Sequence, residues 1–431
     1  MKTAYTHCAV FDGCAESTMQ QDMTILVDGD KIAAVQPGDA LIPDGYTVRV
    51  CTGQYAVPGL INLHMHLFGS GKPSKALAGG GNQQAILKLV KKWPGSKVLD
   101  GMVAAHLKAA LHAGTTTVRA VGDFYYSDVR ARKKIANGKL QGPRLLVSGP
   151  ALTVPGGHGD GTFGETATDA QGFAALVAER FAHKVDFIKI CVTGGVMDAK
   201  KKGEPGELRM NLAQTKAVCA AAHKLGYHVA SHTESVEGVR VALAGGVDTI
   251  EHGSTVDAET AALYRQHASA LVCTISPAFP LAKLDTSLTL LPEVAKYNAV
   301  VVWQGIVEGA KAALAAGIPV GLGTDASCPF VAPYDMWREV YYFATQVGVG
   351  NAFALHTATL QNAKILDIDK ETGSLQAGKC ADILFVNQNP LEDLRALRTA
   401  AMVVHKGQLI ARPHVKKDAA IETALAPFVA D

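Results

Sequence analysis

The chain has 431 residues, of which 48% are hydrophobic and 19% charged, the proportions of a protein with a large buried core. Its 41 basic and 39 acidic residues leave a formal net charge of +2, which argues neither for nucleic acid nor for another polyanionic partner, and we expect no nucleic-acid partner. No run of about 18 apolar residues predicts a membrane span, and the N-terminus lacks the apolar stretch of a signal peptide. The eight cysteines form no Cys-x-x-Cys pair, so we expect a cytoplasmic protein without disulfides.

Short strands are predicted throughout residues 1–57. The segment 24–35 is typical of a hairpin with its turn at Asp28-Gly29-Asp30. Residues 49–57 predict a further strand that leads into Pro58. Because this segment is too small to bury a core alone, we expect it to pair with another part of the chain.

Residues 58–361 show short β-rich runs that alternate with longer helical patterns. Helices over residues 101–112 and 215–224 end near glycines, which often close a helix before the next strand. The predicted strands are Gly59–His66, Thr115–Gly122, Arg144–Ser148, Asp186–Thr193, Tyr227–Thr233, Asp248–His252, Ala270–Ser276 and Ile318–Asp325. Eight strand–helix repeats are typical of an α/β protein built as a (β/α)8 TIM barrel.

The strand-rich character returns after about residue 362. Residues 373–386 predict a turn followed by a strand, and residues 401–410 predict a hairpin that turns at Lys406-Gly407. We expect residues 362–412 to join residues 1–57 in one small β domain, into which the barrel is inserted. The tail, residues 413–431, has an ambiguous pattern that allows a terminal helix.

Two long segments follow predicted barrel strands and should therefore lie on the carboxyl-terminal face, where barrel active sites form. The first, residues 68–97, contains Gly79-Gly80-Gly81, and the second, residues 193–210, contains Lys200-Lys201-Lys202. A lid or a plain surface loop is the favoured interpretation for the triple glycine, and the lysine run is typical of a solvated face. The triple glycine is a weaker candidate for a phosphate cradle, because no Lys-Ser/Thr pair follows it.

His64 and His66 end the predicted strand 59–66. A strand directs alternate side chains to one face, so both imidazoles point the same way. Neutral imidazole is the commonest side-chain metal ligand, and this pair could hold one ion from one side. A half-buried strand with two incidental histidines is the alternative, and further ligands must decide between the two.

Further strands also end in side chains that can bind a metal: Lys189, His232, His252 and Asp325. One inward-facing position on each strand brings all of them to the same rim. Each residue also has an ordinary explanation, since a strand-end histidine can be structural and Asp325 can cap a helix. Lys189 is costly to bury unless it is neutralised, modified or paired with Asp186 or Asp248. The combination on separate strands favours a metal centre.

These motifs resemble those of the amidohydrolase superfamily over nearly the whole chain. The matching segments are VPGLINLHMH (57–66), AGTTTV (113–118), EHG (251–253), GTD (323–325) and GKCADI (378–383). The resemblance implies a metal-dependent (β/α)8 barrel with a β-sandwich built from both termini. The segments FIKICVTGG (187–195) and GGHGD (156–160) are similar to the branch of prolidase-like and Xaa-Arg/Lys dipeptidases, whose neighbours include an ochratoxin-hydrolysing amidase.

That branch implies a particular set of metal ligands. His64, His66 and Asp325 would hold one divalent ion, expected to be Zn²⁺, and His232 and His252 would hold a second. Lys189, carboxylated at its side-chain nitrogen, would bridge the two ions, which also accounts for a lysine in a buried strand. One-metal members that hydrolyse imidazolones or purines generally lack this lysine, and this disfavours them. The same resemblance implies a homo-oligomer.

The expected chemistry follows from two cations that share a water. They would lower the pKa of this water and provide hydroxide at neutral pH, which attacks an amide carbonyl. Asp325 would act first as general base and then as general acid toward the leaving amine. His158, in a glycine-rich loop, is the candidate donor to the oxyanion. A loop histidine without a catalytic role is the alternative for His158.

The substrate is expected to be a small molecule, either a dipeptide or an N-acyl amino acid. Its carboxylate needs a cationic or hydroxyl partner, and Tyr125, Tyr126, Lys200 and Arg209 remain equal candidates. Hydrolysis of another amide, a lactam or a carbamate, such as a mycotoxin or xenobiotic amide, is the second hypothesis. A non-catalytic metal-binding scaffold is the third.

Overall fold

The computed structural model describes residues 2–73 and 94–429. The triple glycine and most of the first long segment therefore lie outside the described residues. Within those residues, no helix combines the length and apolar character needed to cross a membrane.

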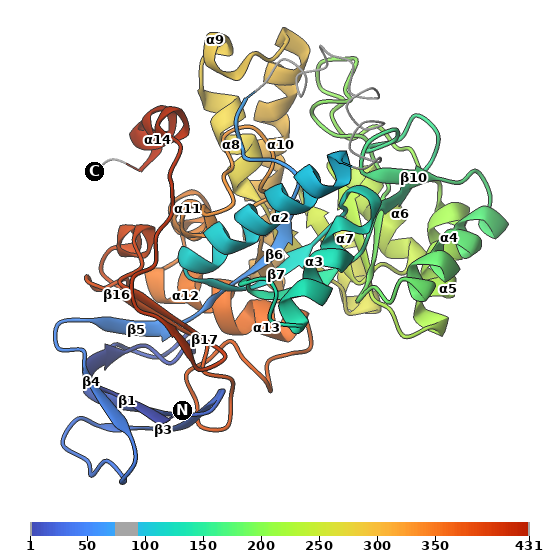
Figure 1. Ribbon diagram of the computed structural model, residues 1–431. Coiled ribbons are helices and arrows are strands. Elements are labelled where there is room, and N and C mark those ends of the chain that lie inside the picture. Colours follow the sequence, from blue (N-terminus) through green and yellow to red (C-terminus); the bar gives the residue numbers. More distant parts are fainter. Residues whose placement is uncertain (1, 74–93, 430–431) are drawn as a thin grey trace.

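One sheet contains strands from both ends of the chain (Figure 1). Its strands are β1 (Lys2–Val10), β2 (Gln20–Asp28), β3 (Lys31–Pro37), β4 (Thr47–Val50), β5 (Tyr55–Pro58), β16 (Ile383–Val386), β17 (Met402–His405) and β18 (Gln408–Ile410). The order is β18-β17-β16-β5-β1-β2-β3, with β4 on β1. Both predicted hairpins are confirmed, since β2 pairs with β3 and β17 with β18.

The pairing of β16 with β5 joins the two ends of the chain. It is antiparallel, with Leu384 opposite Val57, and it confirms that the C-terminal strands complete the N-terminal sheet. Tyr5, Ile25 and Phe385 are buried in the core of this sheet. Residues 383–410 therefore provide the strands with which the N-terminal strands complete one sheet.

All strands expected for the barrel are present, and each is parallel to its neighbours. They are β6 (Leu60–Met65), β7 (Thr115–Ala120), β8 (Arg144–Val147), β11 (Ile188–Cys191), β12 (Val229–Thr233), β13 (Thr249–His252), β14 (Ala270–Cys273) and β15 (Val320–Leu322). They belong to the sheets β6-β7-β8 and β10-β9-β11-β12-β13-β14-β15, where β9 is Ala151–Thr153 and β10 is Gly164–Thr166. Hydrogen bonds link the sheets at Asp186 N to Val147 O (2.8 Å) and Asp325 N to His64 O (2.8 Å).

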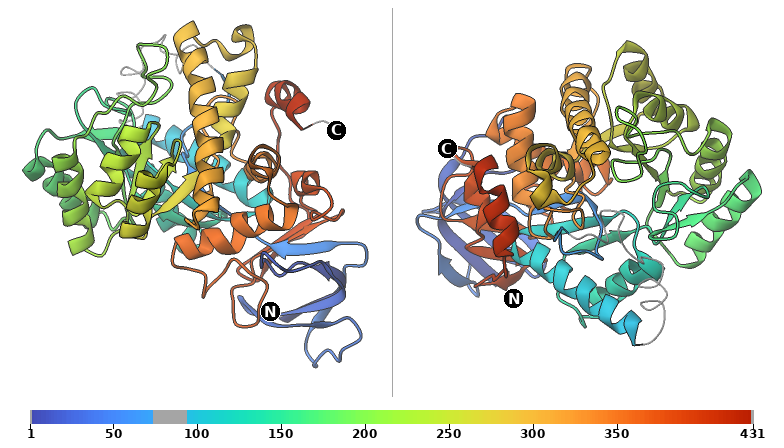
Figure 2. Two further views of the ribbon diagram at one scale, coloured as in Figure 1. Left: turned by 180° about the vertical axis from the view of Figure 1, so that it is seen from behind. Right: turned by 90° about the horizontal axis from the view of Figure 1, so that it is seen from above.

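Helices cover these strands on their outer side (Figure 2). The main ones are α2 (Gly95–His112), α3 (Ser127–Ala136), α4 (Ala170–Ala182), α5 (Leu212–Lys224), α6 (Val236–Gly245), α7 (Ala258–His267) and α10 (Glu293–Ala315). Asp169, Asn211, Ser235 and Asp257 cap α4, α5, α6 and α7 with side-chain hydrogen bonds. The result is a TIM-barrel-like α/β fold.

Glycines let β15 approach β6 closely, as the sequence predicts. A Cβ atom on Gly323 would lie 2.4 Å from the His64 Cβ, and one on Gly321 would lie 2.6 Å from Leu63. Asn362, at the start of α13 (Asn362–Ile365), donates from Nδ2 to Ile61 O (2.7 Å) and Leu322 O (2.9 Å). This contact brings the strand end that carries Asp325 beside the one that carries His64.

The connection after β14 forms a helical extension that projects from the barrel-like body (Figures 1 and 2, yellow). It consists of α8 (Ile275–Lys283), α9 (Thr286–Thr289) and the N-terminal part of α10. Leu281 on α8 and Val302 and Ile306 on α10 line a cavity beneath it. At the other end of the chain, α14 (Ala419–Leu425) provides the terminal helix that the tail allowed.

Candidate active site

His64, His66 and Asp325 form the first ligand group. Their candidate ligand atoms lie within 4.8 Å of one another, and all three side chains are buried. Asp325 Oδ1 lies 3.4 Å from His64 Nε2 and 3.3 Å from His66 Nε2. Although burial opposes it, these two imidazoles hold the pKa of Asp325 well below its usual range. The group offers two nitrogens and an anionic oxygen to one cation.

The second ligand group consists of His232, His252 and Glu234. Their candidate ligand atoms also lie within 4.8 Å of one another. The two groups adjoin, because the His252 ring centroid lies 4.8 Å from that of His64 and 4.6 Å from that of His232. Two cations could therefore occupy neighbouring positions.

Lys189 lines the same cavity. Its side chain is buried, and its Nζ makes no hydrogen bond within the described part of the chain. Asp186 and Asp248, the ordinary partners considered for it, bind Arg132 and His223 instead. Burial lowers the pKa of Lys189. A buried, unpaired amine beside two ligand groups is suited to carboxylation, which would turn it into an anionic ligand.

Each histidine is oriented by a hydrogen bond from one ring nitrogen. The contacts are His64 Nδ1 to Glu251 Oε2 (2.7 Å), His66 Nδ1 to Gly122 O (2.7 Å), His252 Nδ1 to Thr274 Oγ1 (2.7 Å) and His232 Nε2 to Gly194 O (3.1 Å). When these nitrogens donate, the other nitrogen of each ring keeps a lone pair for a cation. Burial also lowers the pKa values of His66, His232 and His252, which favours their neutral forms.

Two residues hold positive φ angles at the ends of their strands, His252 at 67° and Asp325 at 55°. Residues other than glycine rarely adopt this conformation, and such strain concentrates where function requires a particular side-chain direction. Both residues belong to the candidate ligand groups. The backbone thus turns sharply at each of these ligands as it leaves its strand.

A buried ion pair supports His64 from behind. Glu251 accepts from Arg119 Nη2 (2.7 Å) and Thr249 Oγ1 (2.6 Å), while its other oxygen contacts His64. Arg119 Nε also donates to Leu63 O (2.6 Å), next to His64 in β6. Although burial opposes it, Arg119 holds the pKa of Glu251 below its usual range. The Glu251 carboxylate, held by Arg119 and Thr249, thus fixes the orientation of the His64 ring.

We expect Glu251→Gln to weaken metal binding about 10- to 100-fold, the usual effect of removing a carboxylate that orients a ligating histidine. Titration of the apo protein with Zn²⁺ against a chromophoric chelator measures this change. Glu259→Gln, at an exposed site on α7 beside Arg240, is the matched control. If Glu251→Gln keeps the wild-type zinc affinity, Glu251 does not contribute to metal binding by orienting His64.

His158 lies beside the second ligand group. Its ring stacks on His232, with centroids 4.1 Å apart and planes at 5°. Its Nδ1 forms a short hydrogen bond with Asp198, which also accepts from Gly195 N (3.0 Å). Burial works against protonation, but Asp198 and Glu234 raise the pKa of His158. The structure thus brings His158 to the cavity, with its orientation fixed by Asp198.

The ligand groups lie in a cavity of about 710 Å³. Aromatic rings form one wall, where Phe163 lies 4.9 Å and Phe68 lies 5.3 Å from the His66 ring centroid. The apolar residues of the helical extension form another wall. Residues from both long segments, including Ser70 and Met197, also line the cavity, as expected for loops on this face. The cavity therefore combines a polar floor with apolar walls.

The tyrosine candidates for substrate binding are not among the residues that line this cavity. The Tyr126 hydroxyl donates to Glu179 (2.8 Å) and accepts from Arg180 (2.6 Å). Tyr125 precedes it in a short 3-10 turn, with φ at 50°. Tyr126 is therefore hydrogen-bonded to residues of α4, and neither tyrosine lines the cavity that contains the ligand groups.

Arg209 is also absent from the cavity lining, as is Lys200. Arg209 contacts Glu207 at 2.9 Å and contributes to lowering the pKa of Asp198. The positive charge of Arg209 therefore adds to that of His158 in stabilising the Asp198 anion.

Sequence reasoning missed Glu234 and Asp198. Glu234 comes two residues after His232, and a carboxylate so near a candidate ligand was an available signal. Asp198 lies in a loop whose sequence does not indicate that it folds back onto His158. Glu251 was noted only as part of a motif, although its contact with His64 gives it a definite role.

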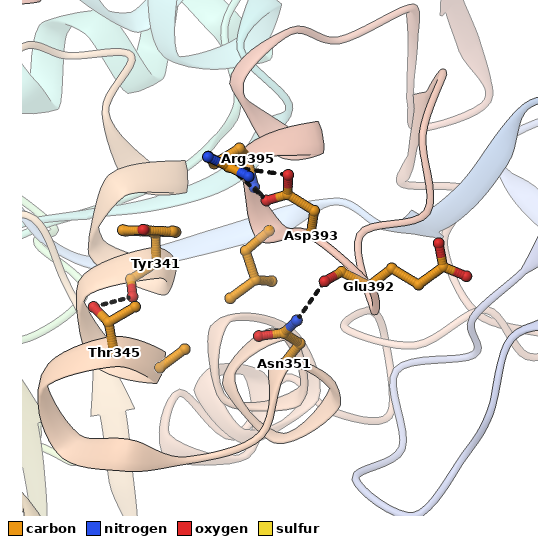
Figure 3. Close-up of a pocket in the computed structure, with 8 residues that line it drawn as sticks. Tyr341, Thr345, Asn351, Glu392, Asp393 and Arg395 are labelled. Carbon is orange, nitrogen blue, oxygen red and sulfur yellow. Dashed lines mark hydrogen bonds and ion pairs between the residues drawn. The ribbon is translucent and has the colours of Figure 1, made fainter. Parts of the chain in front are cut away.

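A smaller cavity of about 280 Å³ shares no lining residue with the larger one (Figure 3). Arg395 binds Asp393 through Nε at 2.9 Å, and Asn351 donates to the main-chain oxygen of Glu392 (3.2 Å). The polar groups there already bind one another. We therefore assign the chemistry to the larger cavity.

Histidines, a lysine and carboxylates gather at the strand ends of this TIM-barrel-like fold. This arrangement is typical of barrel hydrolases that use a metal centre. The family model described as Amidohydrolase family matches residues 55–410, and the chain belongs to this family. It is thus a hydrolase that acts on C–N bonds.

Known proteins similar to this chain extend the comparison. A solved structure from Bifidobacterium longum, provisionally named a prolidase, is 36% identical, covers 100% of this chain and 99% of its own, and has a TM-score of 0.87. A Xaa-Pro dipeptidase with methionine in its active site is 29% identical, covers 95% and 99%, and has a TM-score of 0.83. Ochratoxinase from Aspergillus niger is 24% identical over 88% of this chain and 80% of its own.

Proposed function

We propose that this protein is a two-metal amidohydrolase that cleaves the amide bond of a dipeptide or an N-acyl amino acid. The observation that carries the proposal is the buried Lys189 Nζ, unpartnered within the described residues and close to two ligand groups. His64, His66 and Asp325 would hold one divalent ion, and His232 and His252 the other, with carboxylated Lys189 between them. The similarity to a Xaa-Pro dipeptidase supports the dipeptide substrate.

Zinc ions in these positions would supply an activated water and a polarised amide carbonyl. Asp325 accepts the proton of the attacking water and delivers it to the leaving nitrogen. His158 donates a hydrogen bond to the oxygen that becomes negative, and Asp198 holds the imidazole in place. The apolar walls orient the substrate side chains and exclude water from the floor.

A second candidate is the hydrolysis of a bulky apolar amide, a lactam or a carbamate. The aromatic wall beside His66 favours it, as does the similarity to ochratoxinase. A non-catalytic scaffold is the remote alternative. Assays of zinc-loaded protein on Xaa-Pro, Xaa-Arg/Lys and N-acyl amino acid libraries distinguish these candidates, since only the first requires turnover of these substrates.

The proposal extends to the organisation of the protein. Residues 1–57 and 362–412 would form a composite β-sandwich, residues 58–361 a closed (β/α)8 barrel and residues 413–431 a tail. The protein would act in the cytoplasm as a homo-oligomer on a small-molecule substrate, without nucleic acid or membrane partners. The pairing of β5 with β16 and the link between β6 and β15 support the domain division.

We expect about two zinc ions per chain in protein purified without chelators, since two adjoining ligand groups are present. Elemental analysis per chain measures this number. Dialysis against a chelator should abolish turnover, and readdition of Zn²⁺ should restore it. A chain that stays metal-free even with excess Zn²⁺ would contradict the proposed function.

A further inference from the structure

Glu234 presents a carboxyl group to the cavity that the described residues engage only in part. It follows the end of β12, and its Oε2 accepts a hydrogen bond from Val196 N (3.0 Å), the only one this carboxylate makes within the described residues. Across those residues it also forms no ion pair, whereas neighbouring Asp198 is bound to His158. The carboxylate is thus held in place and has capacity for another donor.

The surroundings of Glu234 restrict what can approach it. A Cβ atom on Gly195 would lie 3.3 Å from both His158 and His232 and 3.4 Å from the Glu234 carboxylate. A larger residue at position 195 would crowd this corner of the cavity. The corner lies at the side of the second ligand group and suits a small group.

The chemistry of cleavage fixes the direction of a bound dipeptide. Asp325 protonates the leaving nitrogen, so the leaving residue lies on the side of Asp325 and His66. Phe68 contacts His66 on this side and offers apolar surface to that residue, while Phe163 lies against both His66 and His158. The acyl residue then lies on the side of His232 and His252. Its α-nitrogen is separated by two bonds from the scissile carbonyl carbon, which brings this nitrogen near Glu234.

An α-ammonium group would match Glu234 in size, and it would favour the anionic form of a carboxyl group whose pKa burial raises to about 8. Two lysines line the cavity among the described residues, and neither contacts Glu234. Lys72 binds Asp418 (2.8 Å), and Lys189 Nζ makes no hydrogen bond among these residues. A charge-assisted hydrogen bond from ammonium to carboxylate is stronger than a neutral one, and it strengthens further in a water-poor cavity.

We propose that Glu234 is the subsite for the free α-ammonium group of the substrate, so that the enzyme prefers unblocked dipeptides with an apolar C-terminal residue over N-acyl amino acids. This inference rests on the proposed function and narrows it. It assigns Glu234 to substrate recognition, with Val196 N holding one of its oxygens and the other directed to the substrate.

The test compares two substrates that differ only by the amine, alanyl-phenylalanine and propionyl-phenylalanine, together with the corresponding proline pair. We expect wild-type kcat/KM to be about 10- to 100-fold higher for the alanyl substrate, the scale of a charge-assisted hydrogen bond. Glu234→Gln should bring this ratio to within about threefold of one, mainly by raising KM for the alanyl substrate. Glu234→Asp should retain part of the preference, and zinc content should stay at the wild-type value.

Glu237→Gln, at an exposed position on α6 three residues away, is the matched control and should keep the wild-type ratio. Loss of zinc from Glu234→Gln would make Glu234 a metal ligand and overturn the subsite. Equal wild-type rates on both substrates of a pair would overturn the subsite and leave the amidohydrolase function intact. A zinc-loaded wild-type enzyme that cleaves neither substrate of either pair would contradict the proposed function and this inference together.

Discussion

Lys189→Ala is expected to remove both bound metal and hydrolytic activity. The Lys189 side chain is 2% exposed, its Nζ has no partner within the described residues, and Asp186 and Asp248 are engaged elsewhere. If carboxylated Lys189 bridges two ions, alanine deletes a ligand from both positions at once. Because the lost ligand is a carboxylate oxygen, acetate or propionate should partly restore zinc content and turnover. Elemental analysis and a dipeptide assay with and without the added acid measure both effects.

Lys216→Ala, at an exposed position on α5, provides the matched control for this substitution. It should keep the zinc content and activity of the wild type. Thermal unfolding of both variants separates loss of fold from loss of metal. Full activity and two zinc ions in Lys189→Ala would refute the bridging role.

Asp325→Asn is expected to lower kcat by at least about 100-fold, on the scale of a lost proton-transfer group. Asparagine preserves the size of the side chain and one oxygen, but it can neither accept the water proton nor protonate the leaving nitrogen. The neighbouring imidazoles hold the pKa of Asp325 well below its usual range, so the wild-type carboxylate is anionic at neutral pH and carries no proton before the water attacks. Steady-state kinetics, expressed per bound zinc, measure the effect.

Asp367→Asn controls for a carboxylate-to-amide change, because Asp367 is exposed and also has a positive φ, at 56°. It should leave kcat at the wild-type value. If Asp325→Asn keeps wild-type kcat per zinc ion, proton transfer belongs to another residue. If the variant loses zinc as well, the first ligand group depends on the carboxylate for binding in addition to its role in proton transfer.

The strands and the gathering of the candidate ligands were predictable because both follow periodic rules. Alternation along a strand places His64 and His66 together, and parallel strands bring His232, His252 and Asp325 to one rim. The glycines at 321 and 323 were rightly interpreted as sites of close approach. Hairpins at both ends were also predictable from their turns, and the pairing of β5 with β16 confirmed that the two ends meet.

Loop residues were not predictable in the same way. Asp198 reaches His158 only because residues 194–198 turn back toward the cavity, a path that no periodicity encodes. Tyr126 follows a strand and looked available to a substrate, but its hydroxyl is bound by Glu179 and Arg180. In both cases the conformation of the loop, and not the residue type, determines whether the side chain reaches the site.

The close contact between β6 and β15 has a consequence for how the protein folds. Asn62 and Thr324, which join these strands at 2.8 Å, are 262 residues apart in the chain. His232 and His252, by contrast, belong to consecutive strands. Closing a long loop costs entropy before its contacts form, and contacts distant in sequence slow folding. During refolding, the ligands on β12 and β13 should therefore come together early, and the trio that includes Asp325 should complete only when the ends of the barrel-like region meet.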